Sequence, residues 1–204
     1  MLRLASATDP RYIDVVLADL DRVLVDHAHC EHKAAITALS FVSKYPDDPR
    51  LVTSLSLLAR DEADHFARMV QVCVDRGLDL GHPEEDRYAR ELLRVVRGNV
   101  LDQRIDRLLV CALIEGRSCE RLQIIGRGLA ERRDLDPDGS LAALYQELWR
   151  QEAEHHTLFI ELAERSVAKA TPEDARARVE RRLHELAAHE ARVLASLPLR
   201  PAIH

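Results

Sequence analysis

The sequence predicts an all-α fold built on four long helices, with a short helix inserted among them and a further helix at the C-terminal end. Two observations support this prediction. The composition favours helix, because Ala, Leu, Arg and Glu are abundant among the 204 residues while only 7 are Gly and 8 are Pro. The Pro and Gly residues gather in short segments between long runs of helical periodicity, and no run alternates like a strand. We therefore expect a single domain over residues 1–204, with its core bundle at about 12–170.

The first two long helices are bounded by prolines and a glycine. A helical run begins near Pro10 and reaches about Tyr45, either as one helix or as a short piece followed by a long one. The segment 46–49, Pro-Asp-Asp-Pro, ends this run because a residue before proline is biased out of the helical conformation. The second helix covers about 50–76, and Gly77 suits the left-handed position that follows a helix end.

The middle of the chain carries the inserted helix and the other two long ones. A short helix is expected near 84–97, where Gly98 stops it, and the third long helix covers about 101–132. The turn 134–139, Asp-Leu-Asp-Pro-Asp-Gly, separates this helix from the fourth, which covers about 140–170.

A last helix is expected at the C-terminal end, over about residues 172–196. Thr171 is suited to cap it, Pro172 is favoured as its first residue, and Glu173 supplies an acid in its first turn. This helix is additional to the core bundle.

Two stretches of the chain share one pattern on the long helices. Residues 60–65 read Arg-Asp-Glu-Ala-Asp-His, and residues 150–155 read Arg-Gln-Glu-Ala-Glu-His. In each stretch a Glu and a His stand three positions apart, so both side chains leave the same face of the helix. Each of the other two long helices carries a lone acid inside an apolar run, Glu31 and Glu115. The repeat indicates two helical hairpins related by internal duplication.

These six side chains fall on the apolar seams of their helices. Steps of three and four residues connect each of them to apolar positions above and below, which is typical of a core-facing stripe. One carboxylate from each of two helices and a Glu-x-x-His pair from each of two others is the ligand set of ferritin-like di-metal bundles. The predicted metal ligands are Glu31, Glu62, His65, Glu115, Glu152 and His155.

The charges of this set explain why metal is expected. A buried carboxylate without compensation costs several kcal/mol, whereas two divalent cations balance four negative charges. Carboxylates can bridge two metals, while each His anchors one and leaves positions open for O₂. Iron and manganese both suit these ligands. The alternative is a bundle whose acids are structural and are satisfied by arginines such as Arg60 and Arg150.

Several histidines near the motifs are weaker candidates. Three of them, His27, His29 and His32, surround Glu31, but at least two must point off the seam, so surface or supporting positions are expected for them. His156 follows His155 directly and could compete with it as a ligand. The corresponding position in the other repeat is a phenylalanine, which favours His155.

Two cysteines and two arginines lie close to the predicted ligands. Cys111 and Cys119 flank Glu115 at four residues on either side, and we expect both to be small apolar fillers near the cluster. Arg60 and Arg150 precede the two motifs identically, and we expect them to pair with ligand carboxylates or with neighbouring acids.

Other features of the sequence narrow the class of protein. No apolar run is long enough for a membrane span, and the N-terminus lacks the apolar core of a signal peptide. The four cysteines form no C-x-x-C pair, which indicates a reduced, cytoplasmic protein and excludes a fused rubredoxin module. The net charge of −6 argues against a chain that attracts polyanions over its whole surface.

Two stretches resemble a known enzyme family. Residues 26–35 read Asp-His-Ala-His-Cys-Glu-His-Lys-Ala-Ala, and residues 107–121 read Arg-Leu-Leu-Val-Cys-Ala-Leu-Ile-Glu-Gly-Arg-Ser-Cys-Glu-Arg. Together with the two Glu-Ala-x-His blocks, they resemble the tRNA 2-methylthio-isopentenyl-adenosine hydroxylase (MiaE-type) family. The resemblance extends over about residues 10–170 and is most specific within 111–121. It implies that the six predicted ligands bind iron, bridged either by Glu62 and Glu152 or by Glu115 with one of these two.

The resemblance also implies an activity and its partners. The expected reaction is the O₂-dependent hydroxylation of the isopentenyl group on the modified adenosine next to the tRNA anticodon. The cofactor would be two iron ions, with O₂ as co-substrate. A separate reductase or ferredoxin would supply electrons, because the sequence carries no flavin or NAD motif. The sequence favours no particular oligomeric state.

A tRNA substrate calls for phosphate contacts, although the chain is acidic overall. Two groups of arginines are candidates for a local basic rim, and the alternative for each is a solvated helix face. The candidates are Arg127, Arg132 and Arg133 in one group and Arg87, Arg90, Arg94 and Arg97 in the other.

Two competing functions remain open from the sequence. A ferritin-like protein that handles peroxide or iron would need no tRNA substrate. A bundle whose acids are purely structural would bind no metal. The tRNA hydroxylase is the preferred hypothesis of the three.

Overall fold

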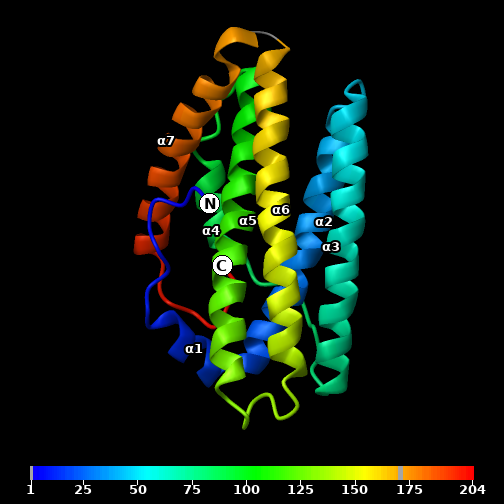
Figure 1. Cartoon of the computed structure of the whole chain (residues 1–204), viewed down its shortest axis with the longest axis vertical. Helices are drawn as coiled ribbons and strands as arrows, with labels where there is room; N and C mark the ends of the chain where they lie inside the picture. The colour runs from blue at the N-terminus through cyan, green and yellow to red at the C-terminus, as the bar shows by residue number, and fades with distance from the viewer. Residues whose placement is uncertain (1, 170–171) are drawn as a thin grey trace. The chain divides into compact units, whose positions relative to one another are not determined.

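The computed structural model describes residues 2–169 and 172–204, and all regular elements in these ranges are helical (Figure 1). These residues divide into two compact units. The first unit comprises Met1–Ile13, Asp86–Leu199 and His204, and the second comprises Asp14–Glu85 and Arg200–Ile203. The second unit is therefore inserted into the first along the chain.

Two long helices, α2 (Leu20–Lys44) and α3 (Pro49–Asp75), make up most of the second unit. They lie side by side and run in opposite directions (Figure 1). The short helix α1 (Tyr12–Ala18) precedes them, and Asp19 separates it from α2. Of the two alternatives that the sequence left open, the structure shows a short piece followed by a long one.

Local sequence explains how α3 begins and ends. The side chain of Asp48 accepts a hydrogen bond from the backbone N–H of Leu51 at 3.3 Å, and Pro49 occupies the first helical position. After the helix, Gly77 adopts a positive φ of 70°, as the sequence predicted for a residue that follows a helix end.

The first unit is built on the antiparallel pair α5 (Val100–Ala130) and α6 (Ser140–Ala168). Gly126 allows the two helices to approach closely, because a Cβ there would lie 3.1 Å from the Cβ of Tyr145. Two further helices, α4 (Arg87–Leu93) and α7 (Ala175–Ser196), pack around this pair (Figure 1). The core of the unit therefore lies along α5, which has more buried residues than the other helices.

A fully buried guanidinium ties several segments of the first unit together. Arg117, on α5, donates two hydrogen bonds to the Glu190 carboxylate of α7 and one to the backbone oxygen of Ser6. It also donates to the hydroxyl of Thr8 at 3.2 Å. Glu190 in turn accepts a hydrogen bond from the hydroxyl of Tyr88 on α4. The N-terminal segment, α4, α5 and α7 thus share one charge-assisted network.

The expected helix bounds differ from the observed ones mainly at two places. The inserted helix α4 is shorter than expected at both ends. The Asp86 side chain accepts a hydrogen bond from the backbone N–H of Ala89, so the helix begins at Arg87, and it ends at Leu93. The C-terminal helix begins with a 3-10 turn, η1 (Pro172–Asp174), and becomes α-helical only at Ala175. The expected cap, Thr171, lies outside the described residues. None of the helices in the described ranges combines the length and apolarity of a membrane span.

Candidate metal centre

In the second unit, α2 and α3 bring three of the predicted ligands together. One oxygen each from Glu31 and Glu62 and one nitrogen of His65 lie within 4.8 Å of one another. The Nδ1 atom of His65 is 3.6 Å from a carboxylate oxygen of Glu31 and 3.6 Å from one of Glu62. All three side chains are buried. Because Glu62 and His65 are three residues apart on α3, both face Glu31 on α2.

His27 supports this triad from the preceding turn of α2. Its Nε2 atom lies 2.5 Å from a carboxylate oxygen of Glu31, and its side chain is buried. Burial alone would raise the pKa of the Glu31 carboxyl, but the charge of His27 and the hydrogen bonds from His27 and His65 outweigh burial and lower the pKa. His27 was one of three histidines expected in surface or supporting positions, and its spacing of four residues from Glu31 places the two side chains on the same side of α2.

In the first unit, α5 and α6 form a matching triad. One oxygen each from Glu115 and Glu152 and one nitrogen of His155 lie within 4.8 Å of one another. The Nδ1 atom of His155 is 3.6 Å from a carboxylate oxygen of Glu152, the same atom and the same separation as between His65 and Glu62. All three residues are buried. Each unit therefore carries two carboxylates and one imidazole in the same local arrangement.

The donor atoms of each triad suit a divalent transition metal. A cation about 2.1 Å from each ligand atom can hold two of them up to about 4.2 Å apart, close to the observed spread. Carboxylate oxygens and imidazole nitrogens are ligands that iron and manganese accept, and two carboxylates balance the charge of one divalent cation. The chemistry of the residues present therefore fits one metal ion per triad.

His156, beside the triad of the first unit, is held in another direction. Its Nδ1 lies 2.6 Å from the carbonyl oxygen of Ala112, so Nδ1 carries the proton and donates it. Burial lowers the pKa of His156, which favours the neutral ring. Gly116 leaves room for this ring, because a Cβ at this position would lie 3.1 Å from Nδ1 of His156 and 3.2 Å from the carbonyl oxygen of Leu2.

The two cysteines near Glu115 are buried and unreactive as placed. Burial raises the pKa of Cys111 to about 12 and that of Cys119 to about 12, so both thiols stay protonated. The Cys119 sulfur lies 3.1 Å from the backbone oxygen of Trp149 on α6, to which it donates. Both residues fill space in the core of the first unit, in line with the sequence analysis.

The two motif arginines lie at the surface of their units. Arg60 pairs with its neighbour Asp61 at 2.7 Å, and 71% of its side chain is exposed. The guanidinium of Arg150 lies 5.4 Å from the centre of the Trp149 ring. Neither arginine is a buried counter-ion, which weakens the alternative in which such arginines satisfy structural acids.

The other two histidines near Glu31 point elsewhere. The Nε2 of His29 lies 2.9 Å from the backbone oxygen of Leu80, and the exposed His32 ring lies 5.2 Å from the ring of Phe66. These placements agree with the expectation that at least two of the three point off the seam.

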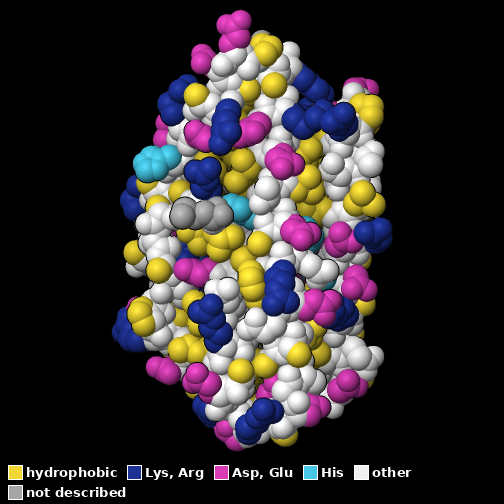
Figure 2. Space-filling model, viewed as in Figure 1, with side chains coloured by type: hydrophobic (Ala, Val, Ile, Leu, Met, Phe, Trp, Pro, Cys, Tyr) yellow, Lys and Arg dark blue, Asp and Glu magenta, His cyan; other side chains and the backbone are white. Residues whose placement is uncertain are grey.

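The arginines considered for tRNA contact are largely engaged with acids. Arg132 forms a two-point hydrogen bond with Asp134, and Arg94 pairs with Glu91 at 2.7 Å. Figure 2 shows Lys and Arg side chains interspersed with Asp and Glu on the face that it draws. The remaining arginines of the two groups differ in their contacts. Arg87 and Arg127 are exposed, Arg133 reaches the backbone oxygen of Pro137, Arg90 pairs with Glu91, and Arg97 binds Asp106.

Comparisons with known proteins agree with this site. A family model described as tRNA-(MS2IO6A)-hydroxylase (MiaE) matches residues 2–204. A tRNA 2-(methylsulfanyl)-N(6)-isopentenyladenosine(37) hydroxylase of Pseudomonas putida is 36% identical over 160 residues, which cover 78% of this chain and 74% of that protein. A Salmonella typhimurium protein of the same name is 29% identical over 208 residues, covering 79% of this chain and 73% of that one.

A solved structure is also similar over almost the whole chain. It is described as protein 43 with aldehyde deformylating oxygenase activity from Synechococcus. The two chains are 33% identical with a TM-score of 0.83, and the similarity covers 98% of this chain and 94% of that one. The predicted fold class, all-α and ferritin-like, is confirmed.

Proposed function

Because the chain belongs to the MiaE family of tRNA hydroxylases, we propose that it hydroxylates the isopentenyl group of 2-methylthio-isopentenyl-adenosine next to the anticodon of tRNA. The observation that carries this proposal is the repeated triad. Each unit buries two Glu and one His at the same spacing, which is the set of donors that an oxygen-activating metal centre requires. A tRNA substrate implies that the enzyme works in the cytoplasm.

We propose that the two triads hold two iron ions in one centre, through Glu31, Glu62, His65, Glu115, Glu152 and His155. Manganese suits the same donors. On the family pattern, bound metals would be bridged either by Glu62 and Glu152 or by Glu115 with one of these. When bound, the metal ions supply the activation of O₂ for insertion of one oxygen atom into a C–H bond. The other oxygen atom leaves as water, which consumes two electrons and two protons per turnover.

The residues around the ligands have supporting tasks. The His27 ring orients the Glu31 carboxylate and stabilises its ionised form, so that both oxygens remain available as acceptors. Burial of the triads excludes bulk water from the reacting region. Neither Cys111 nor Cys119 belongs to the clustered donor groups, and the Cys119 thiol donates instead to the backbone oxygen of Trp149. No side-chain nucleophile is needed, because the ligand side chains would only bind the metal ions and adjust their positions around them.

The reaction requires a partner for electrons. We propose a separate reductase or ferredoxin, since the sequence contains no flavin or nicotinamide motif. The substrate is presented by the anticodon loop, whose modified adenosine must leave its stack to reach a buried centre.

Nucleoside analysis of tRNA tests the proposal. The purified chain, loaded with iron and supplied with a chemical or enzymatic reductant and O₂, should convert the isopentenyl nucleoside to its hydroxylated form in tRNA from a strain that lacks the activity. Mass spectrometry of the digested tRNA detects the gain of one oxygen atom. An unchanged nucleoside profile with a fully iron-loaded protein would contradict the proposal.

A second oxygen-dependent activity belongs in the same assay, because the similar Synechococcus protein is described as having aldehyde deformylating oxygenase activity. An aldehyde substrate, incubated under identical conditions, should be unchanged if the enzyme is a tRNA hydroxylase. Peroxide loss or large iron uptake without tRNA would instead support the ferritin-like alternative, which the comparisons do not favour.

A further inference from the structure

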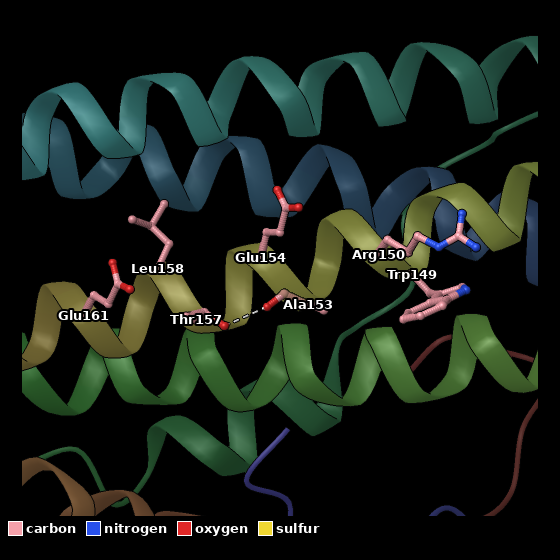
Figure 3. A pocket seen from close by; sticks show the side chains of 7 residues that line it. All are labelled: Trp149, Arg150, Ala153, Glu154, Thr157, Leu158 and Glu161. Atoms are coloured by element: carbon pink, nitrogen blue, oxygen red, sulfur yellow. Dashed lines mark hydrogen bonds between the residues drawn. The ribbon is translucent and has the colours of Figure 1, made fainter. Parts of the chain in front are cut away.

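A solvent-open hollow with a volume of about 460 Å³ lies on α6 in the first unit (Figure 3). This volume is within the range of about 300–1,000 Å³ that is usual for small-molecule sites. All of its lining side chains come from α6, from Trp149 to Glu161. The predicted ligands Glu152 and His155 belong to the same stretch of α6 but leave the helix on the side away from most of this lining.

One end of the hollow pairs an aromatic ring with a cation. Trp149 is partly exposed, and its indole N–H is already satisfied by the side-chain oxygen of Gln146 at 3.0 Å. The guanidinium of Arg150 lies 5.4 Å from the centre of the ring. Among the described residues Arg150 forms no ion pair with a carboxylate, so its charge is available to a ligand. A flat ring beside an available guanidinium suits an unstacked base and its phosphate.

The remaining lining matches a nucleoside with an apolar substituent. Ala153, one turn after Trp149, is small and leaves space beside the ring, while Leu158 offers an apolar surface. Glu154 and Thr157 add polar atoms that can bind ribose hydroxyls or a base N–H (Figure 3). The lining thus extends from Trp149 on one side of α6 to Glu154 and Leu158 on the other (Figure 3).

We propose that this hollow receives a nucleotide of a single-stranded RNA loop, with Trp149 stacked on an unpaired base and Arg150 on the adjoining phosphate. The inference rests on the proposed function and adds a recognition surface to it. Trp149 and Arg150 bind RNA here and hold no metal. Because the modified adenosine has left its stack, a neighbouring ring that replaces the lost stacking lowers the cost of extrusion.

The charges along α6 determine which end of the hollow would bind the phosphate of the nucleotide. Arg150 lies at one end of the hollow, and Glu154 and Glu161 lie further along the helix. At about 1.5 Å per residue, Arg150 and Glu161 are roughly 16 Å apart along the helix axis. The carboxylates repel phosphate and accept hydrogen bonds, so the phosphate belongs at the Arg150 end and the sugar or base edge beside Glu154.

The chain offers a direct reporter for this contact, because Trp149 is its one tryptophan. Iron-loaded protein is titrated with an anticodon stem-loop RNA that contains isopentenyl-adenosine, while tryptophan emission and the anisotropy of a label on the RNA are both recorded. We expect emission to be quenched with the same midpoint as the anisotropy change. A fully paired RNA duplex of equal length should leave the emission unchanged. Binding by anisotropy without a change in emission overturns the proposal, and so does the absence of any binding.

Substitutions of Trp149 and Arg150 measure separately how stacking and charge contribute to RNA binding. Trp149→Ala should weaken binding of the stem-loop, and raise KM, by about ten-fold or more, while Trp149→Phe should retain most of the affinity. Arg150→Gln should weaken binding and reduce the slope of log affinity against log salt by about one. Arg165→Gln, an exposed arginine further along α6, is the matched control and should behave like the wild type. Iron content should stay unchanged in all four variants, and Arg165→Gln should also keep the kcat of the wild type.

The outcomes distinguish this inference from the proposed function. If the wild type hydroxylates the RNA but Trp149→Ala and Arg150→Gln bind it with wild-type affinity, the hollow is not the recognition surface and the function stands. If emission is quenched and the variants bind weakly, but no nucleoside gains oxygen, the recognition surface stands and the hydroxylase proposal fails.

Discussion

Two acids of the same motif, two residues apart on α3, have opposite surroundings. The Glu62 side chain is 0% exposed and faces His65, whereas Asp64 is exposed. Glu62→Gln removes the charge of one donor while keeping its shape, and Asp64→Asn is the matched control. We expect Glu62→Gln to lower the iron bound per chain by at least half and to abolish hydroxylation, because an amide is a weak ligand for the metal. Metal analysis of the purified proteins measures this.

Asp64→Asn should keep the iron content and activity of the wild type. Equal metal content in both variants would show that the exposed and buried acids are equivalent, and would remove Glu62 from the ligand set.

A glycine on α5 leads to a second prediction at the scale of single residues. Gly116→Ala places a methyl group 3.1 Å from Nδ1 of His156 and 3.2 Å from the carbonyl oxygen of Leu2, in a packed region with little room to adjust. We expect a loss of about 1–3 kcal/mol in the free energy of unfolding, measured by urea denaturation. Gly98→Ala, where a Cβ meets nothing within 4 Å, should change stability little.

Residue spacing predicted which buried carboxylates and histidines lie close together, but it predicted the contacts of their neighbours poorly. Glu62 and His65 could be assigned because helix periodicity fixes which positions share a face with the apolar seam. Arg150 lies beside Trp149 instead of an acid, and long flexible side chains have many directions open to them from the same backbone position. The contact between His27 and Glu31 depends on both side chains being buried together, which periodicity alone does not specify.

At the scale of elements, one carboxylate joins three segments of the first unit. Asp106, on α5, accepts hydrogen bonds from Arg97 in the loop after α4 and from Arg182 on α7. Its side chain is 0% exposed. Burial alone would raise the pKa of Asp106, but the hydrogen bonds from the two arginines lower it below its ordinary value of 3.8.

This carboxylate predicts a pH-dependent stability. A depressed pKa in the folded protein adds stability that is fully present above the unfolded value and is lost as the pH falls through the folded one. At neutral pH, Asp106→Asn should therefore lower the free energy of unfolding by about 2 kcal/mol. The difference from the wild type should shrink below about pH 4, where the unfolded wild type also becomes protonated. Urea unfolding across this pH range measures both.

The control for this experiment is Asp134→Asn, because Asp134 pairs with Arg132 at the surface. It should have little effect at any pH. A difference between Asp106→Asn and wild type that stays constant down to about pH 2.5 would contradict the assigned pKa direction.

The helices were predictable from the residues that begin and end them. Prolines, glycines and capping acids fixed the four long helices to within a few residues, because each acts through local backbone geometry. The inserted helix was expected over 84–97 but covers only Arg87–Leu93. Its sequence has helical propensity beyond Leu93, yet the backbone N–H of Arg97 donates to Asp106 instead of continuing the helix. Such a tertiary contact overrides local propensity and cannot be read from spacing.

For the whole molecule, the charge of the two triads leads us to expect that bound metal stabilises the fold. Together they bury four carboxylates, and without cations the repulsion and lost hydration favour the unfolded chain. Removing metal with a chelator at neutral pH should lower the thermal midpoint of unfolding. Ferrous iron at about a hundred times its Kd should restore about 2.7 kcal/mol of stability. Thermal scans under anaerobic conditions, with and without iron, measure the shift.

Magnesium is the matched control for that experiment, because it prefers oxygen ligands and retains its water. It should restore little stability. An identical thermal midpoint for metal-free and iron-loaded protein would show that the buried acids are satisfied by the protein alone.

The Arg117 network has a consequence for how the polypeptide matures during synthesis. Its guanidinium needs Thr8 and Glu190, partners that are separated by most of the chain. On the ribosome, the N-terminal segment can bind Glu120 and Arg117 once α5 is made, but Glu190 joins the network only when α7 emerges. A chain that stalls before α7 leaves Arg117 with Glu120 as an ion-pair partner but without Glu190, and such truncated products should be recognised as incomplete and degraded.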